Sequence, residues 1–78
     1  MTWQPIKPFD TPQQHQAVST FVEQEVKEGR AHFVPVKAHY GKATFEERWV
    51  ERLETGEIWR LVAPDYPFRG AFEVVGSP

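Results

Sequence analysis

Three histidines are the first side chains to consider, because imidazole is a common metal ligand and a common general base. His32 and His39 are seven positions apart in a β-rich stretch. On one regular strand an odd separation places two side chains on opposite faces. No two histidines have the H-x-H or H-x-x-x-H spacing that is typical of metal sites. We therefore expect no metal and no other cofactor.

Neither serine of the chain has the neighbours in sequence that a catalytic nucleophile needs. Ser19 and Ser77 are the only serines, and the chain has no cysteine. His15, Ser19 and Glu23 share one helical face. A catalytic triad needs its base between nucleophile and acid, whereas here the serine lies in the middle. We therefore predict a polar helix face and no enzymatic activity from a single chain.

A turn bounded by prolines carries the side chains best suited to protein recognition. Pro64 and Pro67 each fix φ, which predicts a rigid turn over residues 64–67. Around it lie Tyr66, Phe68, Arg69 and Arg60. Tyrosine and arginine are typical anchors of protein interfaces, and a rigid loop loses little entropy on binding. We predict a non-enzymatic protein-interaction or regulatory module that uses these residues; the structural alternative folds Phe68 back over the core.

The segment 27–42 indicates an alternative class of partner. Its basic and imidazole side chains are Lys27, Arg30, Lys37, His39 and Lys42. Basic residues beside strand-borne aromatics can bind single-stranded nucleic acid. A formal net charge of −2 and a pI near 5.9 argue against a dedicated nucleic-acid-coating protein. A small nucleic-acid-binding regulator is therefore the alternative function.

Length and composition bound the fold class and the location. The 78 residues suffice for one small domain, and 40% hydrophobic with 26% charged residues is ordinary for a globular protein. No apolar run approaches the ~20 residues of a membrane span, and the first residues lack a signal-peptide pattern. A chain without cysteine suits a reducing compartment. We expect a cytoplasmic protein that does not associate with membranes.

The chain divides into an arm, a domain and a tail. Residues 1–10 contain two prolines and no regular pattern, so they read as an extended arm. Its apolar residues Trp3, Ile6 and Phe9 recur at every third position, which suits packing along one edge of the body. Residues 11–75 are expected to form a single α+β domain, and residues 76–78 a frayed tail.

Residues 11–29 carry the clearest helix signals. Thr11 suits the N-cap, Pro12 suits the first helical position, and Gln14 completes a T-x-x-Q capping box. The apolar stripe is made by Val18, Phe21, Val22 and Val26. Gly29 can adopt the left-handed conformation that ends a helix. We expect this stripe to be buried against a sheet.

Strand patterns follow the helix. Residues 31–40 and 68–75 read as strands, and Pro35 places the first of them at a sheet edge because proline donates no ladder hydrogen bond. Pro35 and Lys37 should protect part of that edge from another chain, yet a spare edge in a small domain still favours a homodimer. The fold expected is α+β, with one N-terminal helix packed on a three- to four-stranded antiparallel β-meander.

Residues 44–53 admit two interpretations. As a helix, Thr44 and Glu47 would form a capping box. As a strand, the segment pairs with residues 57–63 across a turn at residues 54–57. We favour this hairpin because its register would place Glu51 opposite Arg60.

Overall fold

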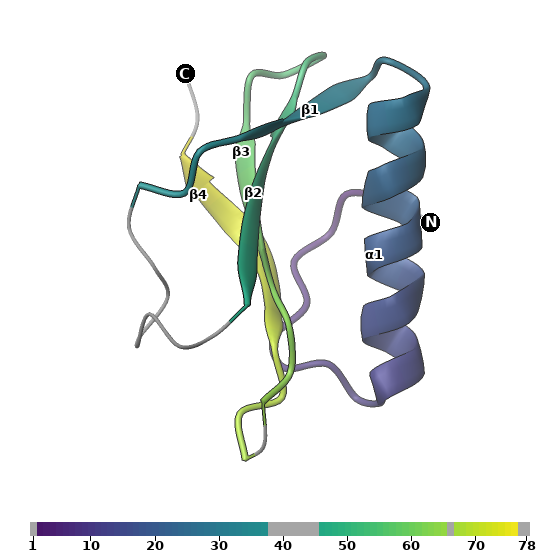
Figure 1. Cartoon of the computed structure of the whole chain (residues 1–78), viewed down its shortest axis with the longest axis vertical. Coiled ribbons are helices and arrows are strands. Elements are labelled where there is room, and N and C mark those ends of the chain that lie inside the picture. Colours follow the sequence, from purple (N-terminus) through teal and green to yellow (C-terminus); the bar gives the residue numbers. More distant parts are fainter. Residues whose placement is uncertain (1, 38–45, 66, 77–78) are drawn as a thin grey trace.

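One helix and four antiparallel strands make up the fold in the computed structural model, which describes residues 2–37, 46–65 and 67–76 (Figure 1). In chain order they are α1 (Pro12–Lys27), β1 (Ala31–Val34), β2 (Glu47–Arg52), β3 (Ile58–Val62) and β4 (Ala71–Gly76). The strands lie in the sheet in the order β1-β2-β3-β4, as an antiparallel meander does. The predicted α+β class, with one helix before a meander, is confirmed. No described helix is long and apolar enough to cross a membrane.

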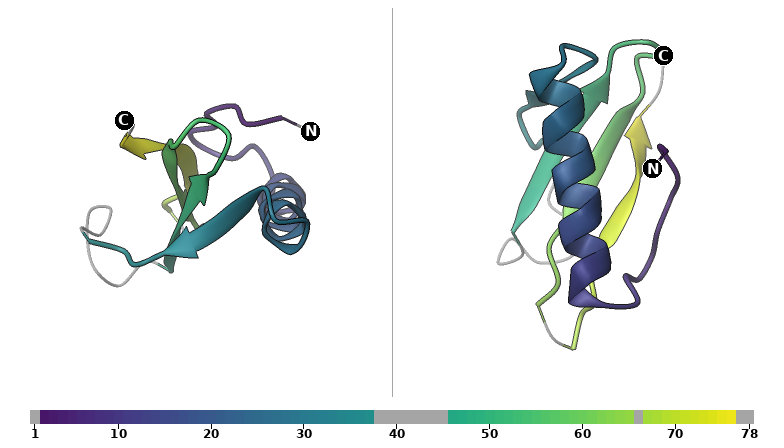
Figure 2. Two further views of the ribbon diagram at one scale, coloured as in Figure 1. Left: turned by 90° about the horizontal axis from the view of Figure 1, so that it is seen from above. Right: turned by 90° about the vertical axis from the view of Figure 1, so that its right-hand side faces the viewer.

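Helix α1 begins where the sequence predicted, because its cap is satisfied locally. The Thr11 hydroxyl accepts a hydrogen bond from the Gln14 N–H at 3.1 Å. The Gln14 side chain in turn accepts one from the Asp10 N–H at 2.6 Å. At the other end Gly29 adopts φ +79°, a conformation that favours glycine. The helix therefore lies within the predicted range and covers one face of the sheet (Figure 2).

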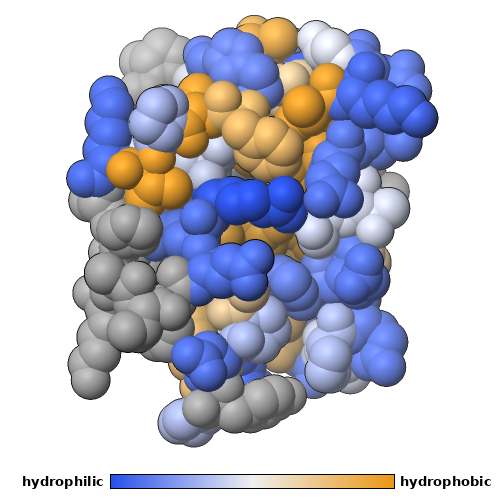
Figure 3. Space-filling model, in the orientation of Figure 1, coloured by the Kyte–Doolittle hydropathy of each residue, from blue (hydrophilic) through white to orange (hydrophobic). Residues whose placement is uncertain are grey.

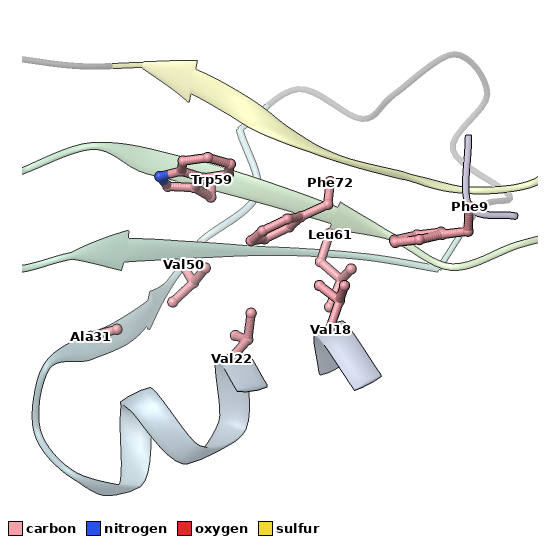
Figure 4. Packing of buried hydrophobic residues seen from close by; sticks show 8 residues of the cluster. All are labelled: Phe9, Val18, Val22, Ala31, Val50, Trp59, Leu61 and Phe72. Atoms are coloured by element: carbon pink, nitrogen blue, oxygen red, sulfur yellow. The ribbon is translucent and has the colours of Figure 1, made fainter. Parts of the chain in front are cut away.

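The core lies between α1 and the helix-facing side of the sheet (Figure 4). Its buried cluster consists of Phe9, Val18, Val22, Ala31, Val50, Trp59, Leu61 and Phe72. The Trp59 and Phe72 rings stack with their centroids 4.8 Å apart. Of the predicted helical stripe, Val18 and Val22 are fully buried, whereas Phe21 and Val26 are half-buried. The helix therefore contributes two complete and two partial core positions.

The N-terminal arm packs on the body, as its apolar spacing predicted. Ile6 and Phe72 exchange two backbone hydrogen bonds of 2.8 Å, so the arm adds one bridge to the β4 edge (Figure 2). The Trp3 ring lies 5.2 Å from that of Phe21 and 5.6 Å from that of Trp59. Phe9 is only 2% exposed. The arm therefore completes the core of this small domain.

The hairpin of β2 and β3 is confirmed, but its predicted register is wrong. Glu51 pairs with Ile58, and Arg60 pairs with Trp49. Gly56 is the last loop residue, with φ +76°, and its N–H donates to the Arg52 carbonyl at 2.7 Å. The loop therefore spans residues 53–56 and not 54–57. The partner of each β2 residue therefore changes by two positions along β3, which leaves the same side chains on the same faces of the sheet.

Two further strand boundaries differ from the prediction. The first strand ends at Val34, directly before Pro35, and residues 38–40 of the predicted strand lie outside the described residues. It lies at a sheet edge, as predicted. The last strand begins at Ala71 and not at position 68, because Gly70 adopts φ +87° and interrupts the extended backbone.

Candidate functional site

The turn between β3 and β4 closes at Asp65 and Phe68. The Asp65 N–H donates to the Phe68 carbonyl at 2.9 Å, and the Phe68 N–H donates back at 3.0 Å. The next residue is anchored as well, because the Arg69 carbonyl accepts from the Phe9 N–H at 3.1 Å. Phe68 is half-buried and the Arg69 side chain is exposed. Tyr66 lies outside the described residues. The Arg69 guanidinium is thus exposed at a turn whose backbone is held by the Asp65–Phe68 hydrogen bonds and by the hydrogen bond from Phe9.

The fourth residue predicted for this site, Arg60, lies on the sheet face opposite α1. Its Nε is 3.5 Å from Glu47 Oε2, and its Nη1 is 3.7 Å from Glu73 Oε2. The Glu47 side chain is completely buried and also accepts from the Trp49 Nε1–H at 2.7 Å. Lys7 adds a looser contact to Glu73 at 3.9 Å. A partner that bound Arg60 would have to replace these carboxylates, so we leave Arg60 out of the candidate site.

The predicted basic segment is only partly described. Lys27 and Lys37 are exposed, whereas His39 and Lys42 lie outside the described residues. Arg30 donates from Nε and Nη2 to Glu25 Oε2, at 2.8 and 2.6 Å. These hydrogen bonds lower the pKa of Glu25 and raise that of Arg30. Among the described basic residues of this segment, Lys27 and Lys37 are therefore exposed cations, whereas the charge of Arg30 is neutralised by Glu25.

The polar helix face contacts β2 through an arginine that sequence reasoning missed. Arg48 Nη2 donates to the Ser19 hydroxyl at 2.9 Å, and Arg48 Nη1 lies 3.4 Å from Glu23. Ser19 and Glu23 are four residues apart on α1, while Arg48 shares the helix-facing side of β2 with Val50. Alternation along β2 was the signal that could have placed Arg48 there. The predicted polar stripe is therefore a helix-to-sheet connection.

A small cavity of about 70 Å³ lies beside this connection, lined by His15, Ser19, Glu46, Arg48, Leu61 and Ala63. Burial, and next the charge of Arg48, lower the pKa of His15 below 6.5, against an opposing effect of Glu46. The His15 ring meets Phe9 edge-on, with centroids 5.4 Å apart. The imidazole is therefore held in an environment that favours its neutral form. A cavity of this size accommodates a few waters and is far below the volume of a drug-sized ligand.

A larger groove of about 360 Å³ lies between the end of α1 and the β2–β3 turn, lined by Glu25, Arg30, Arg52, Leu53 and Glu54. Its charges are matched by neighbours, since Arg52 lies 3.5 Å from Glu54 in addition to the Arg30–Glu25 pair. Leu53 is 47% exposed at its rim. Its described lining contains no histidine and no serine. The groove can bury an apolar group, but its lining offers no nucleophile.

The edge strand β1 carries apolar surface that the sequence did not single out. Phe33 is 43% exposed, and the Arg48 guanidinium lies over its ring at 5.1 Å from the centroid. Val34 and Val36 are half-buried. Hydrophobic side chains gather in the upper part of this face of the molecule, where β1 runs, above a band of hydrophilic ones (Figure 3). Among the described residues, no strand pairs with the outer side of β1, and Phe33 exposes apolar surface there.

His32 is the remaining histidine among the described residues. Its Nε2 lies 2.7 Å from Glu51 Oε1, across the β1–β2 ladder. This contact is a cross-strand pair on a half-exposed surface, where such pairs contribute modestly to sheet stability. Within residues 2–37, 46–65 and 67–76, no three His, Asp or Glu side chains come together as metal ligands would.

Comparison with known proteins finds no matching family model, no matching curated protein and no matching solved structure, so the function is argued from the residues of this chain alone.

Proposed function

We propose that this chain is a non-enzymatic protein-interaction module that binds its partner through the turn carrying Tyr66, Phe68 and Arg69. The observation that supports the proposal is the anchoring of this turn. Reciprocal Asp65–Phe68 hydrogen bonds close it, and the Phe9 N–H holds the carbonyl of Arg69 while leaving its side chain exposed. Because this backbone is already held by hydrogen bonds, binding through the turn costs little further backbone entropy.

The chemistry of the turn indicates the kind of partner surface it fits. An exposed guanidinium binds carboxylates through paired hydrogen bonds and stacks on aromatic rings. Phe68 is half-buried and directly precedes Arg69. A partner surface that combines an acidic group with an aromatic or aliphatic one would match both side chains. Tyr66 would add a hydroxyl that can hydrogen-bond to water before binding and to the partner afterwards.

The side chains that could act in catalysis support a non-enzymatic role. Ser19 accepts a hydrogen bond from Arg48, and no histidine or carboxylate in the described part of the chain hydrogen-bonds to its hydroxyl. His15 lines a cavity of about 70 Å³, whereas substrate pockets are usually ~300 Å³ or more. The larger groove is lined mainly by ion-paired side chains. These arrangements stabilise the fold and leave the surface for recognition.

Affinity capture from the native lysate tests the proposal. The bait is the whole chain, compared with the double variant Tyr66→Ala/Arg69→Ala. The matched control, Lys27→Ala/Lys37→Ala, removes two exposed cations from the basic segment. We expect a protein that the wild type and the lysine control recover equally, that the turn variant loses, and that nuclease treatment does not release. Because Arg69 is exposed, its loss should change stability by no more than ~0.5 kcal/mol.

Two outcomes would contradict the proposal. Equal recovery by the turn variant would show that Tyr66 and Arg69 are not at the contact. Loss after nuclease treatment, together with loss in the lysine variant, would favour the nucleic-acid-binding alternative, because phosphate contacts depend on cationic side chains.

A further inference from the structure

The groove at the carboxyl end of α1 has walls that backbone hydrogen bonds hold in place. The Leu53 N–H donates to the Arg30 carbonyl at 3.0 Å, which ties the β2–β3 turn to the segment after the helix. The turn itself is closed by the Gly56 N–H, which donates to the Arg52 carbonyl at 2.7 Å. The groove volume of about 360 Å³ lies within the range of small-molecule sites, which begins at ~300 Å³. A ligand would therefore find this groove already formed.

Both guanidiniums that line the groove are already engaged. Arg30 donates from Nε and Nη2 to a single carboxylate, that of Glu25. Arg52 lies 3.5 Å from Glu54 and 3.4 Å from Glu57. An anionic ligand would have to displace these carboxylates, which costs the ion pairs that it replaces. The groove is therefore poorly suited to an anion.

Carboxylates outnumber guanidiniums among the described charged groups at this groove. Arg30 interacts with Glu28 as well as with Glu25, and Arg52 likewise has two carboxylates beside it. Four carboxylates thus surround two guanidiniums. The carboxyl end of α1 adds the negative end of the helix dipole. The potential in the groove is therefore negative and favours a cation.

Glu54 and Leu53 place a carboxylate and an apolar surface side by side in the lining. The Glu54 side chain is 81% exposed, and its one contact among the described residues is the 3.5 Å approach of Arg52. That distance is beyond an ordinary N–H···O hydrogen bond, so the carboxylate can accept others. Leu53 is 47% exposed. A cation on Glu54 could therefore lay an attached apolar group along Leu53.

We propose that this groove binds a small primary amine with an alkyl or aromatic body, its ammonium on Glu54 and its body along Leu53. An ammonium offers three donors to the carboxylate and to water. The ion pair adds modestly to affinity because Glu54 is exposed. We therefore expect a dissociation constant on the order of 1 mM for a minimal ligand. The groove and the β3–β4 turn lie at opposite ends of the molecule (Figure 1), so this binding is independent of the partner binding proposed above.

NMR titration of the isotope-labelled whole chain tests the proposal, with phenethylamine as the probe. Phenylethanol and phenylpropionate present a similar ring with a neutral and an anionic group. We expect the amine to shift the amide signals of residues 28–30 and 52–56, with a dissociation constant on the order of 1 mM. The alcohol should bind about threefold more weakly and the acid more weakly still, because only the ammonium pairs with Glu54.

Two variants separate the charge from the apolar contact. Glu54→Gln should remove the preference for the amine over the alcohol. Leu53→Ser should weaken the binding of both by about threefold or more, because the ring loses apolar surface. Glu23→Gln is the matched control and should behave as the wild type. Glu23 is a 59% exposed carboxylate with an arginine contact at 3.4 Å, and it does not line the groove.

Three outcomes would overturn the proposal. The first is an absence of shifts at residues 28–30 and 52–56 up to about 20 mM phenethylamine in the wild type. The second is binding of the acid or the alcohol as tight as that of the amine. The third is an unchanged preference for the amine in Glu54→Gln. The wild-type comparison of the three probes needs no variant, and none of these outcomes bears on the β3–β4 turn.

Discussion

Replacing Gly70 by alanine should destabilise the protein for two separate reasons. Gly70 has φ +87°, and a side chain in that region costs about 1–2 kcal/mol. An added Cβ would also lie 2.5 Å from Phe9 Cδ2 and 2.9 Å from the Val62 carbonyl oxygen. Relieving such overpacking typically costs about 1–3 kcal/mol. Since alanine also reduces the entropy of the unfolded chain by about 0.4–1 kcal/mol, we expect a net loss of about 2–4 kcal/mol.

Gly29→Ala is the matched control for the backbone effect. Gly29 has a similar φ of +79°, but an added Cβ would meet nothing within 4 Å. Its cost should therefore be about 1 kcal/mol. Gly76→Ala, where the Cβ also meets open space and φ lies outside the left-handed region, should change stability by no more than ~0.5 kcal/mol.

Urea unfolding followed by tryptophan fluorescence measures all three variants. The midpoint in a thermal scan should fall by about 4–8 °C for each kcal/mol lost. The difference between Gly70→Ala and Gly29→Ala isolates the close contact with Phe9 and Val62. If the two variants lose equal stability, the packing of the arm against this turn is not as described, and the reasoning fails.

Three further predictions concern the core and the helix-to-sheet connection. Phe72→Ala should lower the free energy of unfolding by about 3–5 kcal/mol, because Phe72 is completely buried. Phe21→Ala should lower it by less, because Phe21 is only half-buried. Equal losses of unfolding free energy in urea would contradict this assignment of the core. Because burial and Arg48 lower the pKa of His15 below 6.5, the unfolded chain binds the proton more readily, so stability should fall as the pH drops below 6.5. His15→Gln should flatten that fall in unfolding free energy, and an unchanged pH profile would contradict it. A double-mutant cycle of Ser19→Ala and Arg48→Ala should give a coupling of about 0.5–1.5 kcal/mol for their 2.9 Å hydrogen bond, and additive losses would show that it contributes nothing.

The elements that the sequence predicted are those fixed by local signals. Thr11, Gln14 and Gly29 define the helix through contacts within a few residues. The β2–β3 hairpin follows from a turn between two β-rich runs. Its register escaped prediction because it depends on which loop position Gly56 occupies, and both registers place the same side chains on the same faces. The alternation of side chains along β2 and β3 therefore predicts which face of the sheet each residue lies on, but not which residues pair across the two strands.

The side-chain contacts of Arg48 and Arg60 were less predictable than the turn, because they join residues far apart in the chain. Arg48 meets Ser19 and Glu23 only once α1 lies across the sheet. Arg60 was expected opposite Glu51, but the shifted register brings it to Glu47 instead. By contrast, Pro35 led to the correct prediction of an edge strand, although β1 ends at Val34 and Pro35 lies just beyond it.

Photo-crosslinking at the turn tests the proposed function most directly. A photoreactive amino acid replaces exposed Asp65, which leaves Tyr66, Phe68 and Arg69 in place; the control carries it at exposed Thr20 on α1. Both substituted chains are irradiated in native lysate, with and without nuclease. The account predicts a discrete protein adduct from position 65 that survives nuclease and is absent from position 20. Equal adducts at both positions, or no adduct at position 65, would contradict binding through the turn.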